Sequence, residues 1–419
     1  MKTRTRDEVY SPVAAHTERA SPKSPSPAIT RSKPDVRFRW KMGVEARWMV
    51  LVSAALISFG LAVLYSASSI DAMTTMGSAT GTFFLVKQLT GLMAGAVVFA
   101  AVAKVDAERL YKLAWPLMAF AILSMLAVLV LPESIAPRLH GSRRFLIGSS
   151  FQPSEFAKLS VIVWVSMLIV KKGDTLRRLS KGLVPFLVVI GVLDILAALE
   201  PDLSVAMLFT LLLGMLLYVG GARMAHFIFL GALSIPVLWS QVDKVKYAMA
   251  RIASFMDPSS APAQIGYQLN QSLIGVGSGG IFGRGFGQGM QQFGFLPFPY
   301  SDFIGSNIGE EWGFVGIFLT TLAFAAYGLL GFRIARQARS QFLQLVAIGL
   351  TFTTVLTAYL HIGVVLGLLP TTGLTLPFIS YGRSNLVLTL LFTGILVNIG
   401  STREKVVGGS ATDPMAVPA

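Results

Sequence analysis

Three carboxylates stand near the start of an apolar segment late in the chain. Asp302 follows the stretch FLPFPYS, and Glu310 and Glu311 come eight and nine residues after it. A charged carboxylate at the bilayer midplane costs about 2.5–3.5 kcal/mol on insertion scales, and less near the interface. A fixed carboxylate facing a cavity can act as a general base, a role that contributes about 10²–10⁴-fold in rate. The alternative for Asp302 is a solvated charge at the membrane surface.

The two glutamates also admit two interpretations. In one, a member of the pair faces the protein interior. In the other, both cap the N-terminus of a helix, where the positive end of the helix dipole favours acidic side chains. The spacing from Asp302 leaves both open, since it does not fix where the helix begins.

A second group of polar residues lies in PRLHGSRRFLIGSSFQPSEFAKL, residues 137–159. Its members are Arg143, Arg144, Gln152, Glu155 and Lys158. The sequence PSEF is typical of a helix start, so Glu155 and Lys158, three residues apart, can form an intrahelical pair. Lys158, however, lies about one turn inside an apolar segment, where a lysine is rare without a partner or a function. Structural and functional interpretations both stay open.

A third polar stretch, LEPDLSVA at residues 199–206, separates two apolar segments with hardly any loop. Glu200 and Asp202 flank its proline. This pattern is either a tight polar turn or a carboxylate that lines the same cavity as Arg144 and Lys158.

Glycines mark two further stretches. Residues 266–289, GYQLNQSLIGVGSGGIFGRGFGQG, lack the GxxxxGK[ST] pattern of a phosphate-binding loop. They indicate a flexible or re-entrant segment, or a lip that closes over a lipid-linked substrate. Residues 370–385, PTTGLTLPFISYGRSN, include Ser380 and predict an ordered hairpin at the outer surface.

The elements that carry these residues are membrane spans. The 419-residue chain is 53% hydrophobic and 13% charged, whereas a soluble domain has about 25% charged residues. Repeated apolar runs of about 18 or more residues predict transmembrane helices. We therefore expect an all-α polytopic membrane protein with about ten transmembrane helices. They cover residues 46–68, 83–103, 111–131, 155–171, 183–199, 203–220, 225–242, 305–332, 342–367 and 385–400.

Basic residues in the short loops set the expected orientation. Their distribution places the N- and C-termini in the cytoplasm and a large extracytoplasmic loop, residues 243–304, between helices 7 and 8. Residues 1–45 are rich in Ser, Pro, Lys and Arg and predict a disordered basic cytoplasmic tail. Residues 46–402 form the transmembrane domain, and residues 403–419 a short cytoplasmic tail.

Composition excludes several classes of protein. The chain has no cysteine, which rules out disulfides and thiolate catalysis, and four histidines without metal-ligand spacing, which argues against a zinc enzyme. The net charge of +14 lies in the tail and inner loops, so it indicates membrane orientation rather than a nucleic-acid partner.

Several ordered blocks together resemble the SEDS family, the shape, elongation, division and sporulation proteins that polymerise peptidoglycan. The division branch is a closer match than the elongation branch, because of GLTLPFISYG and the long N-terminal tail. The blocks are LYSASS (64–69), GSRRF (141–145), FQPSEFAKL (151–159), EPDLSVA (200–206), YQLNQSLIGVGSGGIFGRGFGQG (267–289), SDFIGSNIGEEWGFVG (301–316) and GVVLGLLPTTGLTLPFISYG (363–382).

The resemblance implies a peptidoglycan glycosyltransferase of the bacterial cytoplasmic membrane that acts in cell division. Its substrate is lipid II, an undecaprenyl-pyrophosphoryl disaccharide-pentapeptide, polymerised at the outer face. The implied partners are a class B penicillin-binding transpeptidase and division-site regulatory proteins, which place the chain at the septum. A lipid II flippase, an elongation polymerase and a non-catalytic scaffold are the alternatives.

The resemblance also implies roles for single residues. Asp302 falls on the family's essential outer-loop aspartate, the catalytic base. Glu310 and Glu311 support the helix next to it. A divalent cation, Mg²⁺ or Mn²⁺, can help to neutralise the leaving group, although no metal motif is visible. The substrate-binding residues are expected to be Arg144, Gln152, Glu155, Lys158, Asp202 and Ser380.

Some positions depart from the family pattern. The family usually has PEAHTDF where this chain has PFPYSDF, and SYGGSS where it has SYGRSN, which adds Arg383. RRW has become RRF, and a common asparagine is His361. These changes bear on rate, metal use and donor contacts, whereas the aspartate itself is retained.

Overall fold

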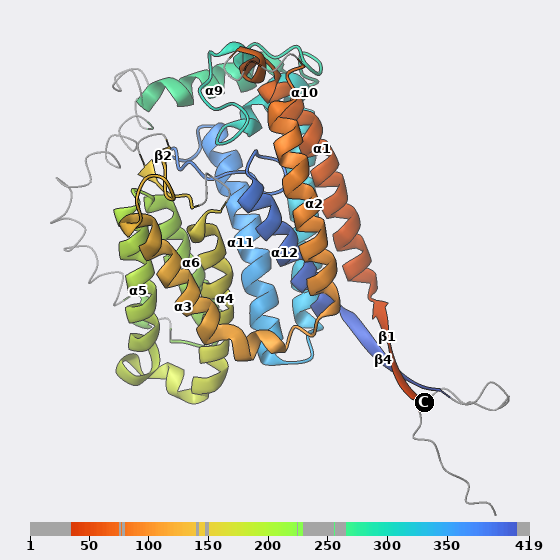
Figure 1. The fold of residues 1–419 in the computed structure, drawn as a ribbon, viewed down its shortest axis with the longest axis vertical. Helices are drawn as coiled ribbons and strands as arrows, with labels where there is room; N and C mark the ends of the chain where they lie inside the picture. Colours follow the sequence, from red (N-terminus) through yellow and green to blue (C-terminus); the bar gives the residue numbers. More distant parts are fainter. Residues whose placement is uncertain are drawn as a thin grey trace, which may run out of the picture. The chain divides into compact units, whose positions relative to one another are not determined.

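The computed structural model describes residues 35–74, 77, 80–139, 142–146, 151–223, 225–228, 255 and 265–408. The chain divides into two units, one formed by Trp40–Glu404 and the other by Met1–Arg39 with Lys405–Ala419. The helices described below belong to the unit Trp40–Glu404, and they run side by side as a bundle (Figure 1).

Nine long helices of the described part form this bundle. Seven of them are long and apolar enough to span a membrane, by length and composition. The other two, α6 and α12, are shorter but also apolar. Helices are the expected solution, because a lipid-exposed backbone must satisfy its hydrogen bonds within the segment. The nine are α1 (Val44–Thr74), α2 (Phe83–Lys104), α3 (Arg109–Val130), α4 (Pro153–Lys172), α5 (Val184–Leu199), α6 (Leu203–Val219), α10 (Ile304–Arg336), α11 (Gln341–Val365) and α12 (Arg383–Ile399).

Short elements join the helices. A hairpin of β2 (Arg138–Leu139) and β3 (Ser142–Arg143) precedes α4, and η1 (Gly173–Arg177) and η2 (Leu179–Leu183) follow it. The turn η4 (Gln291–Phe293) lies between α9 (Ile265–Gly279) and α10.

Local sequence explains several helix ends. The Asp202 carboxylate accepts a hydrogen bond from the Val205 N–H at 3.4 Å and caps α6, and the Ser340 hydroxyl accepts one from Leu343 N–H at 3.3 Å and caps α11. A proline lies in the first turn of α4, where no intrahelical donor is lost. The kink in α10 falls at Gly313, whose φ of 65° only a glycine adopts readily.

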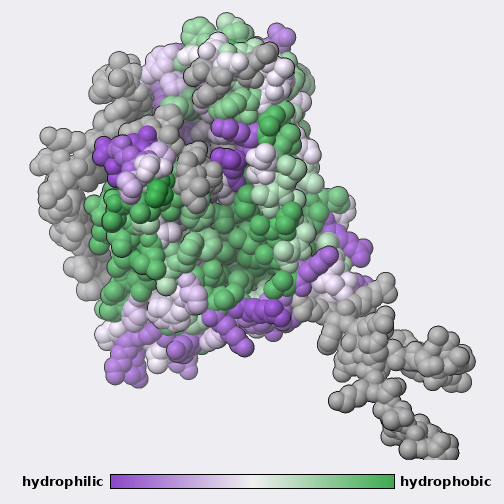
Figure 2. Space-filling view, viewed as in Figure 1, coloured by the Kyte–Doolittle hydropathy of each residue, from purple (hydrophilic) through white to green (hydrophobic). Residues whose placement is uncertain are grey.

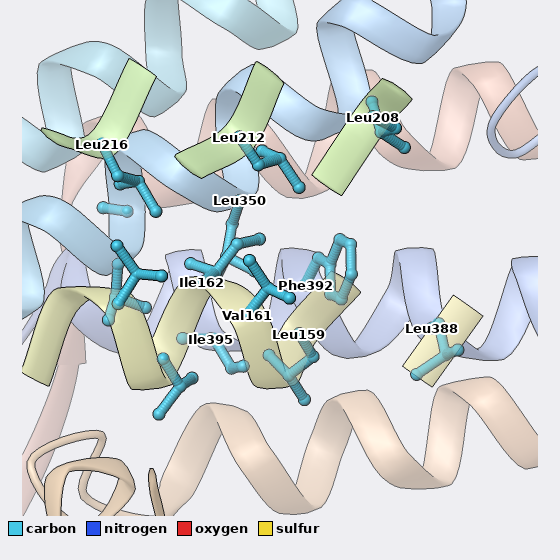
Figure 3. Packing of buried hydrophobic residues seen from close by; sticks show 14 of the residues in the cluster. Leu159, Val161, Ile162, Leu208, Leu212, Leu216, Leu350, Leu388, Phe392 and Ile395 are labelled. Carbon is cyan, nitrogen blue, oxygen red and sulfur yellow. The ribbon is translucent and has the colours of Figure 1, made fainter. Parts of the chain in front are cut away.

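Helix α4 is the centre of the bundle. In its membrane-span window 83% of residues are buried, and it contacts α3, α6, α11 and α12. Figure 3 shows Leu159, Val161 and Ile162 of α4 facing side chains of α6, α11 and α12. A helix that is apolar on all sides is typically buried. A charged residue on α4, such as Lys158, therefore needs a partner.

The end of the bundle where α2, α4, α6, α10 and α12 begin is called the site end below. Figure 1 places α9 there. The strands β1 (Asp35–Met42) and β4 (Ser401–Gly408) pair in a two-stranded sheet. In Figure 2 a band of hydrophobic surface separates hydrophilic residues at the two ends. This distribution fits a bundle that crosses a bilayer along its length.

Nine of the ten predicted spans coincide with these helices. Most of the other, 225–242, lies outside the described residues, as do residues 1–34 of the predicted tail. Residues 35–42, placed in that tail by the sequence, form β1. The predicted outer loop contains α9, so the first part of the glycine-rich stretch is a helix rather than a flexible segment.

Candidate functional site

Asp302 lies immediately before α10, half-buried at the site end. The Ser301 hydroxyl donates to Asp302 Oδ1 at 2.7 Å. The Ser380 hydroxyl in turn donates to the Ser301 carbonyl at 2.7 Å and accepts from the Leu376 N–H at 2.8 Å. Ser380 belongs to the connection between α11 and α12, residues 366–382, which we call the arch. The arch therefore fixes the segment that carries Asp302.

The arch also reaches the α5–α6 turn. A Cβ placed on Gly373 would lie 3.8 Å from Asp302 Oδ2, and the glycine has a φ of +72°, which disfavours other residues. The neighbouring Thr372 carbonyl accepts a hydrogen bond from the Ser204 hydroxyl at 2.5 Å. Because Ser204 is in the first turn of α6, the arch ties the Asp302 segment to the turn that holds Asp202.

Tyr300, two residues before Asp302, packs against other aromatic rings. Its ring centroid lies 4.4 Å from that of Phe84 and 5.9 Å from that of Tyr381. Burial raises the pKa of the Tyr300 hydroxyl, and so does the charge of Asp71, to which the hydroxyl donates a hydrogen bond. The sequence analysis missed Asp71, although it lies two residues beyond the LYSASS block.

Arg144 binds the α5–α6 turn through hydrogen bonds and an ion pair. Its Nε donates to the Glu200 carbonyl at 3.2 Å and its Nη2 to the Pro201 carbonyl at 2.5 Å, while Nη1 lies 3.4 Å from Asp202 Oδ2. The preceding Arg143 donates instead to Glu133 at 2.9 Å, because successive side chains of an extended segment point to opposite sides. Arg144 and Asp202 therefore form an ion pair at the α5–α6 turn.

Glu200, which the sequence offered together with Asp202 but which was not among the expected substrate-binding residues, is deeply buried. Its side chain is 1% exposed, and neither carboxylate oxygen has a hydrogen-bond partner among the described residues. Burial raises its pKa from 4.5 to about 8, the charge of Asp202 adds to the rise, and Arg144 opposes it. The sequence placed Glu200 in a tight turn but did not indicate that its side chain is buried.

Gln152, Glu155 and Lys158 lie at the start of α4. Lys158 Nζ is 2.6 Å from Glu155 Oε1, so the intrahelical pair forms, and both side chains are almost fully buried. The Gln152 side chain donates to the Ser154 hydroxyl at 3.2 Å, and its backbone N–H donates to the Ser384 hydroxyl at 3.2 Å. The contact with Ser384 joins the start of α4 to the start of α12.

Glu310 and Glu311 lie in the second turn of α10, so they do not cap that helix as one interpretation expected. Glu310 accepts hydrogen bonds from the backbone N–H groups of Met290 at 2.8 Å and Gln291 at 3.1 Å. Glu311 accepts one from the Ser66 hydroxyl at 2.5 Å. The two carboxylates therefore tie α10 to the segment before it and to α1.

His361 occupies the position that is commonly asparagine. Its Nδ1 lies 2.8 Å from the Leu374 carbonyl, and its Nε2 lies 3.3 Å from the Gly305 N–H. The first contact requires a donor and the second an acceptor, so the ring is neutral with its proton on Nδ1. His361 thus joins the arch to the first turn of α10, which is a structural role.

The described residues contain no group of three or more His, Asp or Glu side chains that could hold a metal ion. Mg²⁺ is usually held by one or two carboxylates together with water and substrate phosphates, so this finding does not bear on the cation that the resemblance implies.

Comparison with known proteins identifies the family of this chain. The family model described as "Cell cycle protein", which covers FtsW, RodA and SpoVE, matches residues 46–405. The chain belongs to the FtsW/RodA/SpoVE family. The match includes every candidate site residue named above. The SEDS family named in the sequence analysis is this family, so that resemblance is confirmed.

Individual relatives agree with the family match. A "Probable peptidoglycan glycosyltransferase FtsW" from Trichlorobacter lovleyi is 36% identical over 355 residues, covering 84% of this chain and 92% of the relative. "Stage V sporulation protein E" from Bacillus subtilis is 35% identical over 356 residues, covering 84% and 95%. The FtsW/RodA/SpoVE match thus extends over nearly the whole length of these relatives.

Solved structures share the fold. One described as "Structural coordination of polymerization and crosslinking by a peptidoglycan synthase complex" has a TM-score of 0.70 and 25% identity, covering 84% of this chain and 97% of that one. Thermus thermophilus RodA has a TM-score of 0.61 and 24% identity, covering 84% and 95%. The bundle is therefore a FtsW/RodA/SpoVE fold and the chain a multi-pass membrane protein.

Arg383, one of the departures noted in the sequence, lies in a groove between helices. It stands at the start of α12 and lines this groove, of about 390 Å³, with Gly91 of α2 and Phe156 of α4. A Cβ on Gly91 would lie 3.1 Å from Arg383 Cγ, so the glycine gives the arginine room. Of the described residues that line the groove, most are apolar and Arg383 is the one charged residue.

Proposed function

We propose that this protein is a peptidoglycan glycosyltransferase that polymerises lipid II into glycan strands during cell division. The observation that carries the proposal is the position of Asp302. Its carboxylate is half-buried at the site end of a membrane bundle and is oriented by Ser301, which Ser380 holds. Membership in the FtsW/RodA/SpoVE family and relatives named peptidoglycan glycosyltransferase support it.

In this proposal Asp302 is the general base. The acceptor hydroxyl gives its proton to the carboxylate, its oxygen forms a bond with the anomeric carbon, and the bond to the polyprenyl pyrophosphate breaks. The departing pyrophosphate takes the electron pair. Gly373 of the arch has no side chain, and a Cβ built there would lie 3.8 Å from Asp302 Oδ2. A correctly placed base contributes about 10²–10⁴-fold in rate.

Charge stabilisation of the pyrophosphate falls to Arg144. Its side chain is 30% exposed, whereas Lys158 is 5% exposed and paired with Glu155. An arginine held by two carbonyls and Asp202 is oriented before the substrate arrives, and preorganised charge costs no rearrangement during the reaction. Gln152, Glu155, Lys158, Asp202 and Ser380 are proposed to shape the same substrate site.

The finer topology is part of the proposal. We place ten spans in the membrane, both termini in the cytoplasm, and the large loop before α10 outside. The basic residues Lys104, Arg109 and Arg336 lie at the end opposite the site end, in accord with the positive-inside rule. The partner is a class B penicillin-binding transpeptidase at the division septum, which the structural likeness to a peptidoglycan synthase complex supports.

Glycan synthesis by the purified protein, assayed on lipid II together with its transpeptidase, tests the proposal. We expect Asp302→Asn to lose activity by about 10²-fold or more. Asp174→Asn is the matched control, because Asp174 is exposed in η1 at the opposite end. Native synthesis by the Asp302→Asn protein would reject the base. Lipid II translocation without synthesis by the native protein would favour the flippase.

A further inference from the structure

The segment between α9 and α10, residues 280–295, exposes large apolar side chains. We call it the aromatic loop. Phe282 is 82% exposed and Phe293 57% exposed. Soluble surfaces rarely gather so many large apolar side chains unless the patch binds something. The exposed members are Ile281, Phe282, Phe286, Met290, Phe293 and Phe295.

This exposed face continues the surface of the membrane-spanning helices. The Phe286 ring lies 6.5 Å from Trp312 of α10, which lies 5.4 Å from Phe59 of α1. Phe314 and Phe318, both exposed on α10, stack at 5.9 Å. Both helices are candidate membrane spans. The aromatic loop therefore borders a surface that faces lipid.

Many backbone groups of the loop form hydrogen bonds within the protein, as a lipid environment requires of non-helical chain. The break at Gly313 leaves helix groups of α10 free to bond with the loop, and Gly283 approaches so closely that a Cβ on it would lie 2.1 Å from the Glu311 carbonyl. Four backbone bonds result: Phe314 N to Gly280 O, Val315 N to Ile281 O, Arg284 N to Glu310 O and Gly285 N to Glu311 O.

Side chains satisfy further groups of the loop. The Glu310 carboxylate accepts the N–H groups of Met290 and Gln291, as described above. The Gln292 amide donates to the carbonyls of Gly287 at 3.1 Å and Gly289 at 2.9 Å. Polar groups thus point inward while phenylalanines point outward.

The aromatic loop carries little charge. Arg284 is the sole charged residue of the sequence 280–295, and its guanidinium lies 3.6 Å from the buried Glu310. Aromatic residues, Met and Arg are also enriched in protein interfaces, so composition does not separate a lipid from a protein partner. The continuity of the loop with the exposed surface of two candidate membrane spans, α1 and α10, favours lipid.

We propose that the aromatic loop inserts its exposed phenylalanines into the interfacial region of the bilayer and anchors the start of α10 there. Because Glu310 bonds to the loop and α10 begins just after Asp302, lipid contact would hold Asp302 at a set depth. The proposal does not depend on the reaction catalysed, since it concerns only where the loop lies.

Spin labelling tests the proposal directly, because the chain contains no cysteine. Phe282→Cys is labelled in vesicles of phosphatidylcholine and phosphatidylglycerol, and its collision rates with oxygen and with a water-soluble nickel chelate are measured. Phe318→Cys on the lipid-facing side of α10 and Glu133→Cys in an exposed turn are the references. We expect nickel collisions severalfold below those at residue 133, with oxygen collisions close to those at residue 318.

Two results would overturn the proposal. Nickel collisions equal to those at residue 133 would place the loop in water. Low collision rates with both reagents would show that protein covers it. Phe293→Cys, at a second exposed position, gives an independent measurement where the Phe282 variant fails to fold.

Discussion

The buried carboxylate of Glu200 makes a quantitative prediction about pH. Its side chain is 1% exposed, and its raised pKa of about 8 compares with an ordinary 4.5. Between these two pH values the folded protein keeps a proton that the unfolded chain loses. The free energy of unfolding must therefore fall as pH rises through this window.

The size of the effect follows from the same two values. Their difference, 8 minus 4.5, at about 1.4 kcal/mol for each pH unit, corresponds to roughly 5 kcal/mol above pH 8. This is an upper bound, because water entering the α5–α6 turn would reduce the cost of the charge. Glu200→Gln keeps the shape of the side chain and removes the titration, so it should remove this part of the pH dependence.

Thermal unfolding of the detergent-solubilised protein, followed from about pH 5 to about pH 9, measures the slope. The native midpoint should fall with rising pH, and Glu200→Gln should lie above it at the alkaline end. Glu133→Gln is the control, because Glu133 is 60% exposed and bonded to Arg143, which lowers its pKa. Equal slopes for the native and Glu200→Gln proteins would refute the reasoning.

Two substitutions test the packing around the site. Lys158→Met leaves Glu155 buried without its partner and should lower the free energy of unfolding by about 3–5 kcal/mol, measured by chemical denaturation, whereas adding Glu155→Leu should restore much of it. Gly279→Ala would place a Cβ 2.0 Å from the Gly309 carbonyl and should cost about 1–3 kcal/mol, whereas Gly277→Ala, with open space around it, should be nearly neutral in the same assay.

Hydropathy predicted the spans because lipid leaves few alternatives to an apolar helix. The boundaries of α2 differ from the predicted 83–103 by one residue, and α6 agrees equally well with 203–220. Helix α1 runs to Thr74, six residues beyond prediction, since its polar last turns leave the apolar run but remain helical. Composition shows where lipid lies, but not how far a helix continues beyond it.

Glycine was harder to interpret from sequence. The glycine-rich stretch 266–289 indicated a flexible or re-entrant segment, yet its first glycines belong to α9. Gly279 lies against the Gly309 carbonyl, and the Ser272 hydroxyl donates to the Val365 carbonyl at 3.0 Å. Tertiary contact overrides the low helix propensity of glycine here. A single sequence cannot distinguish a glycine needed for close approach from one needed for flexibility.

The end of the helix at which a carboxylate lies decides whether the helix dipole favours its negative charge. Asp202 caps α6, Asp302 precedes α10, and Glu155 lies in the first turn of α4. The positive ends of these helix dipoles favour a negative charge at each place. Glu200 instead ends α5, where the dipole is negative. Burial raises the pKa of Glu200, and its place at the negative end of the α5 dipole acts in the same direction.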